Sequence, residues 1–258
     1  MRQMEERHQV ILQRLQLNGR VYVADLSHEL EISEVTIRKD LKELEERGAL
    51  RRIHGGASKL TKVAMELTLD EMRKINVEEK RAIAREAYKF VSDNDVLLLD
   101  ASTTSGELAY LLRDGTKKGI TVITTALHIA CELVPCEHLE VVQIGGNIRR
   151  TLYTAMGPLA TTAIRSLHVD KAFIGVNGID AKIGYTTQNL LECELKRCMI
   201  ESASQSFVLA DSSKIGIVRL GVVCPVGNVD FLITDGRIEP ETRNELERTG
   251  VELVVAEL

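Results

Sequence analysis

The chain contains one stretch that decides its fold, Ser33-Glu34-Val35-Thr36-Ile37-Arg38-Lys39-Asp40-Leu41-Lys42-Glu43-Leu44-Glu45-Glu46-Arg47-Gly48. At about 100° per residue, a helix places Ile37, Leu41 and Leu44 on one narrow stripe. The opposite side then carries Val35 together with the polar or cationic side chains of Thr36, Arg38, Lys39 and Lys42. The stretch therefore predicts a helix with one packing face and one cationic face.

The neighbouring residues place this helix third in a small domain. Val10, Ile11 and Leu15 mark a first helix, Asn18-Gly19 breaks it, and Val23 to Leu30 form a second. Ser33 stands at the N-cap position of the third helix, and Gly48 ends it. Residues 49–57 are short, partly apolar and rich in turn residues, which is typical of a β-hairpin. Three helices and a hairpin predict a winged helix-turn-helix.

A helix of this kind fits the major groove of DNA, where its first residues contact bases and flanking cations contact phosphates. We expect Ser33 at the start of the helix, with Val35 and Thr36 near bases, Arg38 on a guanine or a phosphate, and Lys39 and Lys42 on phosphates. Arg51, Arg52 and His54 extend the cationic surface into the wing. The alternative is a solvated helix face with ion pairs such as Lys39–Glu43 and Lys42–Glu46.

Beyond a weakly patterned connection at 59–76, helical and strand patterns alternate. Apolar runs predict strands at Val96–Asp100, Ile120–Thr125, Leu139–Ile144, Ala172–Val176, Phe207–Ala210, Phe231–Thr234 and Val251–Val255, with helices such as Glu79–Phe90 and Leu190–Ser202 between them. This alternation predicts an α/β fold with a mostly parallel sheet covered on both faces. The predicted domains are thus 1–58 for DNA binding, 59–76 as linker, and 77–258 as the α/β domain.

Composition limits the setting of the protein. The 258 residues carry a net charge of −5, but residues 1–62 hold 12 Lys and Arg against 10 Asp and Glu, so this part is at +2 and the rest at −7. The five cysteines include no C-x-x-C pair, and no apolar run approaches the roughly 20 residues of a membrane span. We expect a cytoplasmic protein without a metal or cofactor.

Three loops at predicted strand ends suit an anionic ligand, because such loops and helix N-termini offer free N–H groups. Asp100 to Gly106 follow a strand and open a helix, so Asp100, Ser102, Thr103 and Thr104 are candidate phosphate-binding residues, with ordinary helix capping as the alternative. Gly145 and Gly146 allow close approach of the backbone, with Arg149 nearby. Lys214 brings an ammonium to the same edge.

The sequence resembles the DeoR family of bacterial transcriptional regulators. We call the predicted domain 1–58 the head and the predicted domain 77–258 the body. In the head, the resemblance rests on Thr36-Ile37-Arg38-Lys39-Asp40-Leu41 and His54-Gly55-Gly56-Ala57. In the body it rests on five stretches, Asp100 to Thr104, Gly145-Gly146, Asp170 to Gly175 with Gly178, Glu192 to Ile200, and Asp211 to Lys214.

The resemblance implies a head that binds operator DNA and a body, similar in fold to ribose-5-phosphate isomerase, that senses a phosphorylated sugar. It also implies that Ser102, Thr103 and Thr104 hold the phosphate, Asp100 faces ligand hydroxyls and Lys214 supplies charge. Ser102 replaces the usual glycine of the motif, and Thr125 stands where asparagine normally follows Thr124.

The predicted function is a repressor of a carbohydrate-metabolism operon that a phosphorylated sugar releases from DNA. One head makes few contacts, so we expect a homo-dimer or tetramer on repeated half-sites. One alternative is a sugar-phosphate isomerase-like enzyme with a DNA-binding appendage, whose general base would be Asp180, Glu192, Glu194 or Asp211. The other is a DNA-binding scaffold whose sheet domain only oligomerises.

Overall fold

The computed structural model describes residues 7–12, 14–15, 20–30, 32–46, 49–53, 55–58 and 67–258. Two compact units divide the chain, residues 1–66 and residues 67–258. The prediction gave residues 67–76 to a linker, but they lie in the second unit and include a short helix, α4 (Leu69–Arg73). Of the described helices, none combines the length and the apolar character that crossing a membrane requires.

The first unit has the elements of a winged helix-turn-helix. Residues 7–12 and 14–15 are helical, and they are followed by β1 (Arg20–Tyr22), α2 (Val23–Glu29), α3 (Glu34–Glu46), β2 (Arg51–Ile53) and β3 (Gly56–Ser58). The predicted hairpin is confirmed as β2 and β3, and β1 adds a third strand antiparallel to β3 that the sequence analysis did not anticipate. The predicted breaks at Asn18-Gly19 and Gly48 lie outside the described residues.

The core of this unit follows the apolar stripe of α3. Ile37, Leu41 and Leu44 are buried against Ile11 and Leu26, as the amphipathic pattern predicts. Each such buried side chain stabilises the folded domain by about 1.5–3 kcal/mol, and this burial is the main source of stability in so small a domain.

The second unit is built on a seven-stranded sheet in the order β15-β14-β12-β9-β4-β5-β6, and all neighbouring strands are parallel. All seven predicted strands are confirmed in it. Their bounds are β4 (Val96–Leu99), β5 (Ile120–Thr124), β6 (Leu139–Gln143), β9 (Val169–Gly175), β12 (Ala203–Leu209), β14 (Phe231–Asp235) and β15 (Glu252–Ala256). The predicted α/β fold is thus correct.

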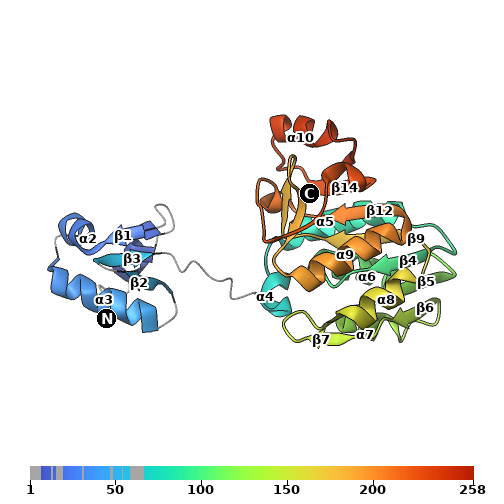
Figure 1. Cartoon of the computed structure of the whole chain (residues 1–258), viewed down its shortest axis with the longest axis horizontal. Helices are drawn as coiled ribbons and strands as arrows, with labels where there is room; N and C mark the ends of the chain where they lie inside the picture. The colour runs from blue at the N-terminus through green and yellow to red at the C-terminus, as the bar shows by residue number, and fades with distance from the viewer. Residues whose placement is uncertain are drawn as a thin grey trace. The chain divides into compact units, whose positions relative to one another are not determined.

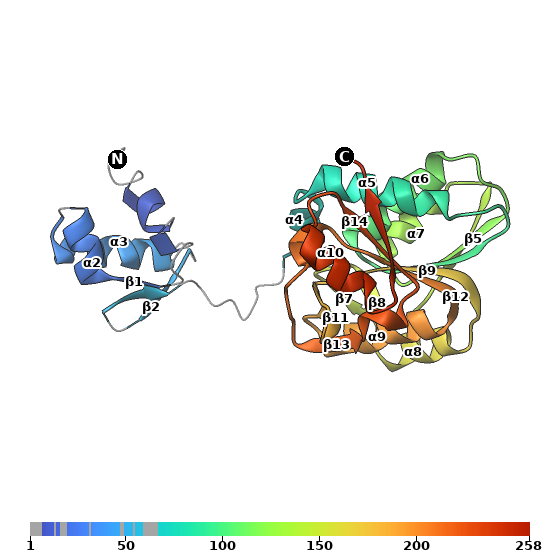
Figure 2. The same ribbon diagram turned by 90° about the horizontal axis from the view of Figure 1, so that it is seen from above.

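Helices cover both faces of this sheet, and the two layers appear above and below it in Figure 2. One face packs against α5 (Val77–Lys89), α6 (Thr103–Asp114) and α7 (Leu127–Leu133), and the other against α8 (Pro158–Arg165), α9 (Leu190–Glu201) and α10 (Pro240–Glu247). Leu97 and Leu99 of β4 face the first layer and Leu98 faces the second, as the alternation of a strand requires. The four phenylalanines of the chain pack together in the first layer, with ring centroids 4.7–5.1 Å apart.

At the carboxyl edge of the sheet lie short antiparallel strands that were not predicted from the sequence. They form a hairpin, β7 (Asn147–Arg149) with β8 (Thr154–Met156), and a small sheet of β10 (Gly178–Asp180), β11 (Gly184–Thr187) and β13 (Gly221–Cys224). Two 3₁₀ turns complete the unit, η1 (Ser212–Lys214) and η2 (Val226–Asn228). Figure 1 labels β7, and Figure 2 labels β7, β8, β11 and β13.

Candidate functional site

The exposed face of α3 begins at its N-cap. Ser33 Oγ accepts a hydrogen bond from the Thr36 N–H at 3.4 Å, and the Ser33 and Thr36 hydroxyls lie 3.0 Å apart. The predicted N-cap is therefore confirmed. The capping fixes the first turn of α3, the part that contacts bases when such a helix enters a major groove.

The polar face of α3 is open to solvent. Val35 is 74 % exposed, and Arg38, Lys39 and Lys42 are also exposed. Arg38 pairs with Glu34, and Lys42 Nζ lies 3.8 Å from Glu46 Oε1. Exposed pairs of this kind contribute only about 0.3–0.5 kcal/mol, so phosphate oxygens can replace the glutamates at little cost. The ion pairs of the alternative interpretation therefore do not prevent DNA binding.

Asp40 serves the fold of the head. It is 2 % exposed, and Arg7 and His8 of the first helix bind its two oxygens, with His8 Nε2 at 3.3 Å. Burial opposes the charge of Asp40, but the hydrogen bond and charge of Arg7 outweigh it and hold the pKa of Asp40 below its ordinary value. Asp40 thus ties the first helix to α3.

The wing is described in part. Arg52 is exposed, and its backbone N–H donates to Glu45 at 2.9 Å, which fixes β2 against α3. The Arg51 backbone belongs to β2, but its side chain and the whole of His54 lie outside the described residues. Their predicted contacts with DNA stay predictions.

In the second unit, the loop after β4 forms the N-terminus of α6. Ser102 caps this helix through Oγ, which accepts from the Ser105 N–H at 3.1 Å. Thr103 and Thr104 lie in the first turn of α6, where a backbone N–H has no helical carbonyl four residues earlier to bind. Neither of these two N–H groups has an acceptor among the described residues. Two backbone donors of the predicted phosphate loop are therefore free to bind an anion.

Asp100 organises this loop. Its Oδ1 accepts from the Ser102 N–H at 3.0 Å and the Ser105 hydroxyl at 2.7 Å, and its Oδ2 accepts from the Gly175 N–H at 3.0 Å and Lys196 Nζ at 2.5 Å. These four donors fill the acceptor capacity of a carboxylate. Asp100 therefore shapes the loop, while its implied contact with ligand hydroxyls stays a prediction.

The loop also depends on Gly175 at the end of β9. A Cβ at this position would lie 2.4 Å from Ser102 Cβ, so the side chain of Ser102 occupies the space that any larger residue at 175 would need. Ser102, where the family usually has glycine, is accommodated in this way.

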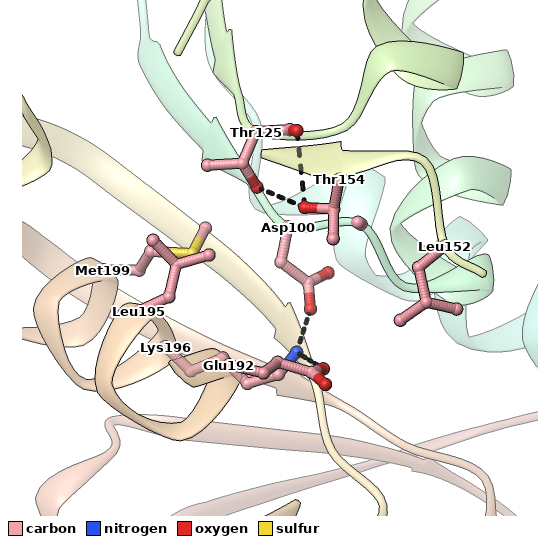
Figure 3. Close-up of a pocket in the computed structure, with 9 residues that line it drawn as sticks. Asp100, Thr125, Leu152, Thr154, Glu192, Leu195, Lys196 and Met199 are labelled. Atoms are coloured by element: carbon pink, nitrogen blue, oxygen red, sulfur yellow. Dashed lines mark hydrogen bonds and ion pairs between the residues drawn. The ribbon is translucent and has the colours of Figure 1, made fainter. Parts of the chain in front are cut away.

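Lys196 links two carboxylates beneath the loop. Its ammonium lies 2.5 Å from Asp100 and 3.0 Å from Glu192, and Glu192 also accepts from Arg149 at 2.8 Å. Burial disfavours the charge of Lys196, but Asp100 and Glu192 outweigh it and raise its pKa. Figure 3 shows the ammonium between the two acids. The predicted residue Arg149 therefore reaches the site through Glu192.

These side chains surround a hollow of about 250 Å³ that includes space open to solvent. Its polar atoms come from the loops after β4 and β5, from β8 and from α9, and the hydroxyls of Thr125 and Thr154 lie 3.3 Å apart on its wall (Figure 3). Its lining is Asp100, Ala101, Thr125, Leu152, Thr154, Glu192, Leu195, Lys196 and Met199. A pocket with hydroxyls, an ammonium and carboxylates over an apolar wall suits a small polyhydroxylated molecule.

The other predicted ligand residues do not line this cavity. Gly146 permits the loop to pack on β8, since a Cβ there would lie 2.7 Å from Met156 O, whereas Gly145 faces open space. Lys214 belongs to η1, with Nζ 4.0 Å from Asp211 Oδ2. The structure therefore brings Asp100, the first turn of α6 and Arg149 together, and leaves Lys214 in a neighbouring cluster.

Two buried basic side chains at this edge escaped the sequence analysis. Lys80 is 6 % exposed, and its ammonium donates to Met72 O at 2.5 Å and Ile75 O at 2.6 Å. Burial lowers its pKa. Burial also lowers the pKa of His128 to about 4, and neither of its ring nitrogens has a partner among the described residues. Such groups are frequent at binding sites.

The carboxylates proposed as general bases are engaged in structural contacts. Glu192 pairs with Lys196 and Arg149, and Glu194 with Arg165. Asp180 accepts two N–H groups of its own turn, and Asp211 accepts from Asn76 and Ser213. This arrangement gives no support to the isomerase alternative.

A winged helix-turn-helix joined to an α/β unit with a polar pocket defines a ligand-responsive transcriptional regulator. Residues 7–63 match the DeoR-like helix-turn-helix domain, and residues 75–236 match the DeoR C terminal sensor domain. The chain therefore belongs to the DeoR family of transcriptional regulators, and it is not an enzyme.

Relatives along the full length agree with this assignment. The chain is 37 % identical over 233 residues to the HTH-type transcriptional regulator GlpR of Haloferax volcanii, covering 90 % of each protein. It is 29 % identical over 245 residues to the lactose phosphotransferase system repressor of Lactococcus lactis, covering 95 % of this chain and 96 % of the relative. Separately from these relatives, the chain is similar over 54 % of each chain to a ribose-5-phosphate isomerase in complex with phospho-erythronic acid, at 17 % identity and a TM-score of 0.40, and this likeness has no part in the assignment.

Proposed function

We propose that the protein represses genes of carbohydrate metabolism and that a phosphorylated sugar, with no further cofactor, releases it from operator DNA in the cytoplasm. The observation that carries this proposal is the first turn of α6, where the Thr103 and Thr104 N–H groups lack acceptors beside a polar cavity. The name of the lactose-system relative supports carbohydrate genes as the target.

The phosphate is assigned to the α6 N-terminus. The positive end of the helix dipole and two free N–H groups attract an anion. The hydroxyls of Ser102, Thr103 and Thr104 stand at the same turn, and Lys214 adds positive charge from η1. A phosphate bound here places the rest of the molecule toward the cavity that begins at Asp100 and Ala101.

The sugar hydroxyls are assigned to that cavity. Thr125 and Thr154 offer hydroxyls that both donate and accept, while Lys196 donates and Glu192 accepts. Leu152, Leu195 and Met199 give it an apolar wall.

The DNA contacts are assigned to the open face of α3 and to the wing, as predicted from the sequence. Val35 and Thr36 contact bases, and Lys39, Lys42 and Arg52 contact phosphates. One head offers few contacts, so two or more copies of the chain bind repeated half-sites as a dimer or tetramer.

Two substitutions at one residue test the anion site. Thr103 is the first residue of α6 and follows an extended Ser102 with ψ of 152°, a setting that accepts proline. Thr103→Pro removes the N–H, and Thr103→Ala removes only the hydroxyl. A hydrogen bond to a charged group contributes about 1.5–3 kcal/mol, so we expect Thr103→Pro to weaken sugar-phosphate binding roughly 10- to 150-fold.

The assay is a thermal-shift screen of phosphorylated and unphosphorylated sugars. At 100 times its Kd, a ligand stabilises by about 2.7 kcal/mol, which is roughly 5–10 °C for a unit of this size. Thr162→Ala on the exposed surface of α8 is the matched control and keeps the full shift. No response to any phosphorylated sugar contradicts the proposal and favours the scaffold alternative.

A further inference from the structure

One part of the surface of the second unit is rich in exposed aliphatic side chains. Five of them are 40–75 % exposed, namely Leu190, Leu191, Val218, Leu220 and Val222. We call this set the aliphatic patch. Single exposed aliphatic side chains are ordinary on a protein surface, but a contiguous group of them marks an interaction site.

Contacts between α9 and β13 bring the two halves of the aliphatic patch together. Cys193 Sγ donates to Val222 O at 2.9 Å, and the Arg197 guanidinium donates to the same carbonyl at 2.8 Å. A Cβ at Gly221 would lie 3.4 Å from Leu190 Cδ2, so the first turn of α9 reaches the strand. Figure 2 shows α9 and β13 on the same side of the unit. The patch is therefore one continuous surface.

The segment 218–222, which leads into β13, has its aliphatic side chains in solvent. Val218, Leu220 and Val222 occupy every second position and are exposed, whereas Gly221 and Val223 are buried. On a sheet surface that faces water, the outward positions of such an alternation are usually polar. Aliphatic residues at these positions indicate that another surface covers them.

The size of the aliphatic patch suits an interface between two copies of the chain. Five side chains of this kind, exposed to these fractions, present an apolar area on the order of 500 Å², which is large for a monomer. A typical stable interface buries roughly 800 Å² on each partner, with an apolar core inside a polar rim. The patch is large enough to supply such a core.

The rim of the aliphatic patch carries charges of both signs, as a surface that binds its own copy requires. Arg219 lies within the segment 218–222, and its exposed side chain has no partner among the described residues. Glu194 lies one turn after Leu190 on α9 and pairs with the exposed Arg165 at 3.3 Å. In a two-fold pair each copy presents the same patch, so the cation of one copy can bind the acid of the other.

We propose that the aliphatic patch is the interface through which two copies of the chain pair about a two-fold axis. This inference rests on the proposed function, which needs two DNA-binding units on repeated half-sites, and it identifies the surface that joins them. None of the five side chains belongs to the DNA-binding unit or lines the cavity. Changes in the patch therefore separate pairing from ligand binding.

Sedimentation equilibrium of the full chain measures the pairing. We expect the wild type to exceed the monomer mass of 28.7 kDa, and Leu220→Glu and Leu190→Glu each to raise the dissociation constant at least about 100-fold. Leu190 is the first residue of α9, where an acid is favourable, so this variant keeps its fold by circular dichroism. Val134→Glu is the matched control, because Val134 is 67 % exposed at the end of α7 in the opposite layer, and it keeps the wild-type mass.

The thermal shift with phosphorylated sugars separates this inference from the proposed function. We expect Leu220→Glu to keep the shift of the wild type while it dissociates. Wild-type assembly in both leucine variants, with the thermal shift present, overturns the interface and leaves the proposed function standing. A wild-type chain that stays monomeric, or equal dissociation of Val134→Glu, also overturns the interface. Absence of any shift in the wild type overturns the proposed function, whatever the mass of the assembly.

Discussion

Replacing Lys196 with methionine tests the polar centre of the sensor unit. Lys196 is 4 % exposed, and its ammonium lies 2.5 Å from Asp100 and 3.0 Å from Glu192. Lys196→Met keeps the apolar stem and removes the charge, so Asp100 retains three of its four donors and becomes a buried anion without a counter-ion. Breaking a buried ion pair in this way costs about 3–5 kcal/mol.

That loss is large compared with a total stability of about 5–15 kcal/mol. For a unit of this size it corresponds to a fall in Tm of roughly 6–20 °C. Differential scanning calorimetry of the full chain measures it, and the transition of the first unit, which lacks this pair, serves as internal reference. Asp100→Asn combined with Lys196→Met recovers part of the loss, because it removes the unpaired anion. A fall in Tm below about 2 °C for Lys196→Met refutes the reasoning.

The difference in Tm between the wild type and Lys196→Met depends on pH in a defined direction. The pKa of Asp100 is lowered on folding, since Lys196 outweighs the effect of burial, so its contribution is lost as the pH falls through the folded pKa. The pKa of Lys196 is raised above 10.5, so its contribution is lost as the pH rises through the folded value. The Tm difference between wild type and Lys196→Met is therefore constant from about pH 5 to 10 and shrinks outside that window.

Three further substitutions have expected outcomes. Arg38→Ala weakens operator binding in a gel shift at fixed salt while circular dichroism stays unchanged, because Arg38 is exposed; unchanged affinity removes Arg38 from the contacts. Asp40→Asn weakens the bonds to Arg7 and destabilises the head by about 1.5–3 kcal/mol in urea unfolding; a smaller effect contradicts its structural role. Gly175→Ala displaces the Ser102 loop and lowers the free energy of unfolding by about 1–3 kcal/mol. We expect this variant to lose the thermal stabilisation by sugar phosphate while DNA binding persists. Retained stabilisation by the ligand contradicts the packing argument.

The sequence predicts the main sheet well, because its parallel strands are buried on both faces and therefore appear as continuous apolar runs, such as Val96 to Leu99. The short strands at its carboxyl edge give no such signal. For example, β10 and β11 are three and four residues long, and their pairing depends on contacts with β13 far along the chain. The helix α4 was missed for a similar reason, since five residues carry no measurable periodicity.

The sequence predicts the helix N-terminus of the candidate site but not the buried lysine beneath it. Helix capping and strand ends pointed to Ser102, Thr103 and Thr104 at the α6 N-terminus, because that signal is local. Lys196 lies 96 residues from Asp100, and no local pattern pairs them. A signal did exist: Lys196 falls on the buried stripe of α9 with Cys193 and Met199, and Lys80 falls on that of α5 with Ile83. A lysine on an apolar stripe indicates a buried, partnered cation.

The central claim is that an anion at the first turn of α6 lowers the affinity of the head for DNA. It is tested most directly by the operator affinity of the full chain, measured by fluorescence anisotropy on a duplex that the chain selects from random sequences, with and without the sugar phosphate that stabilises it most. We predict affinity about 5- to 150-fold lower with the ligand, and no ligand effect in Thr103→Pro. Equal affinity in both conditions, with the ligand shown to bind, would contradict the account.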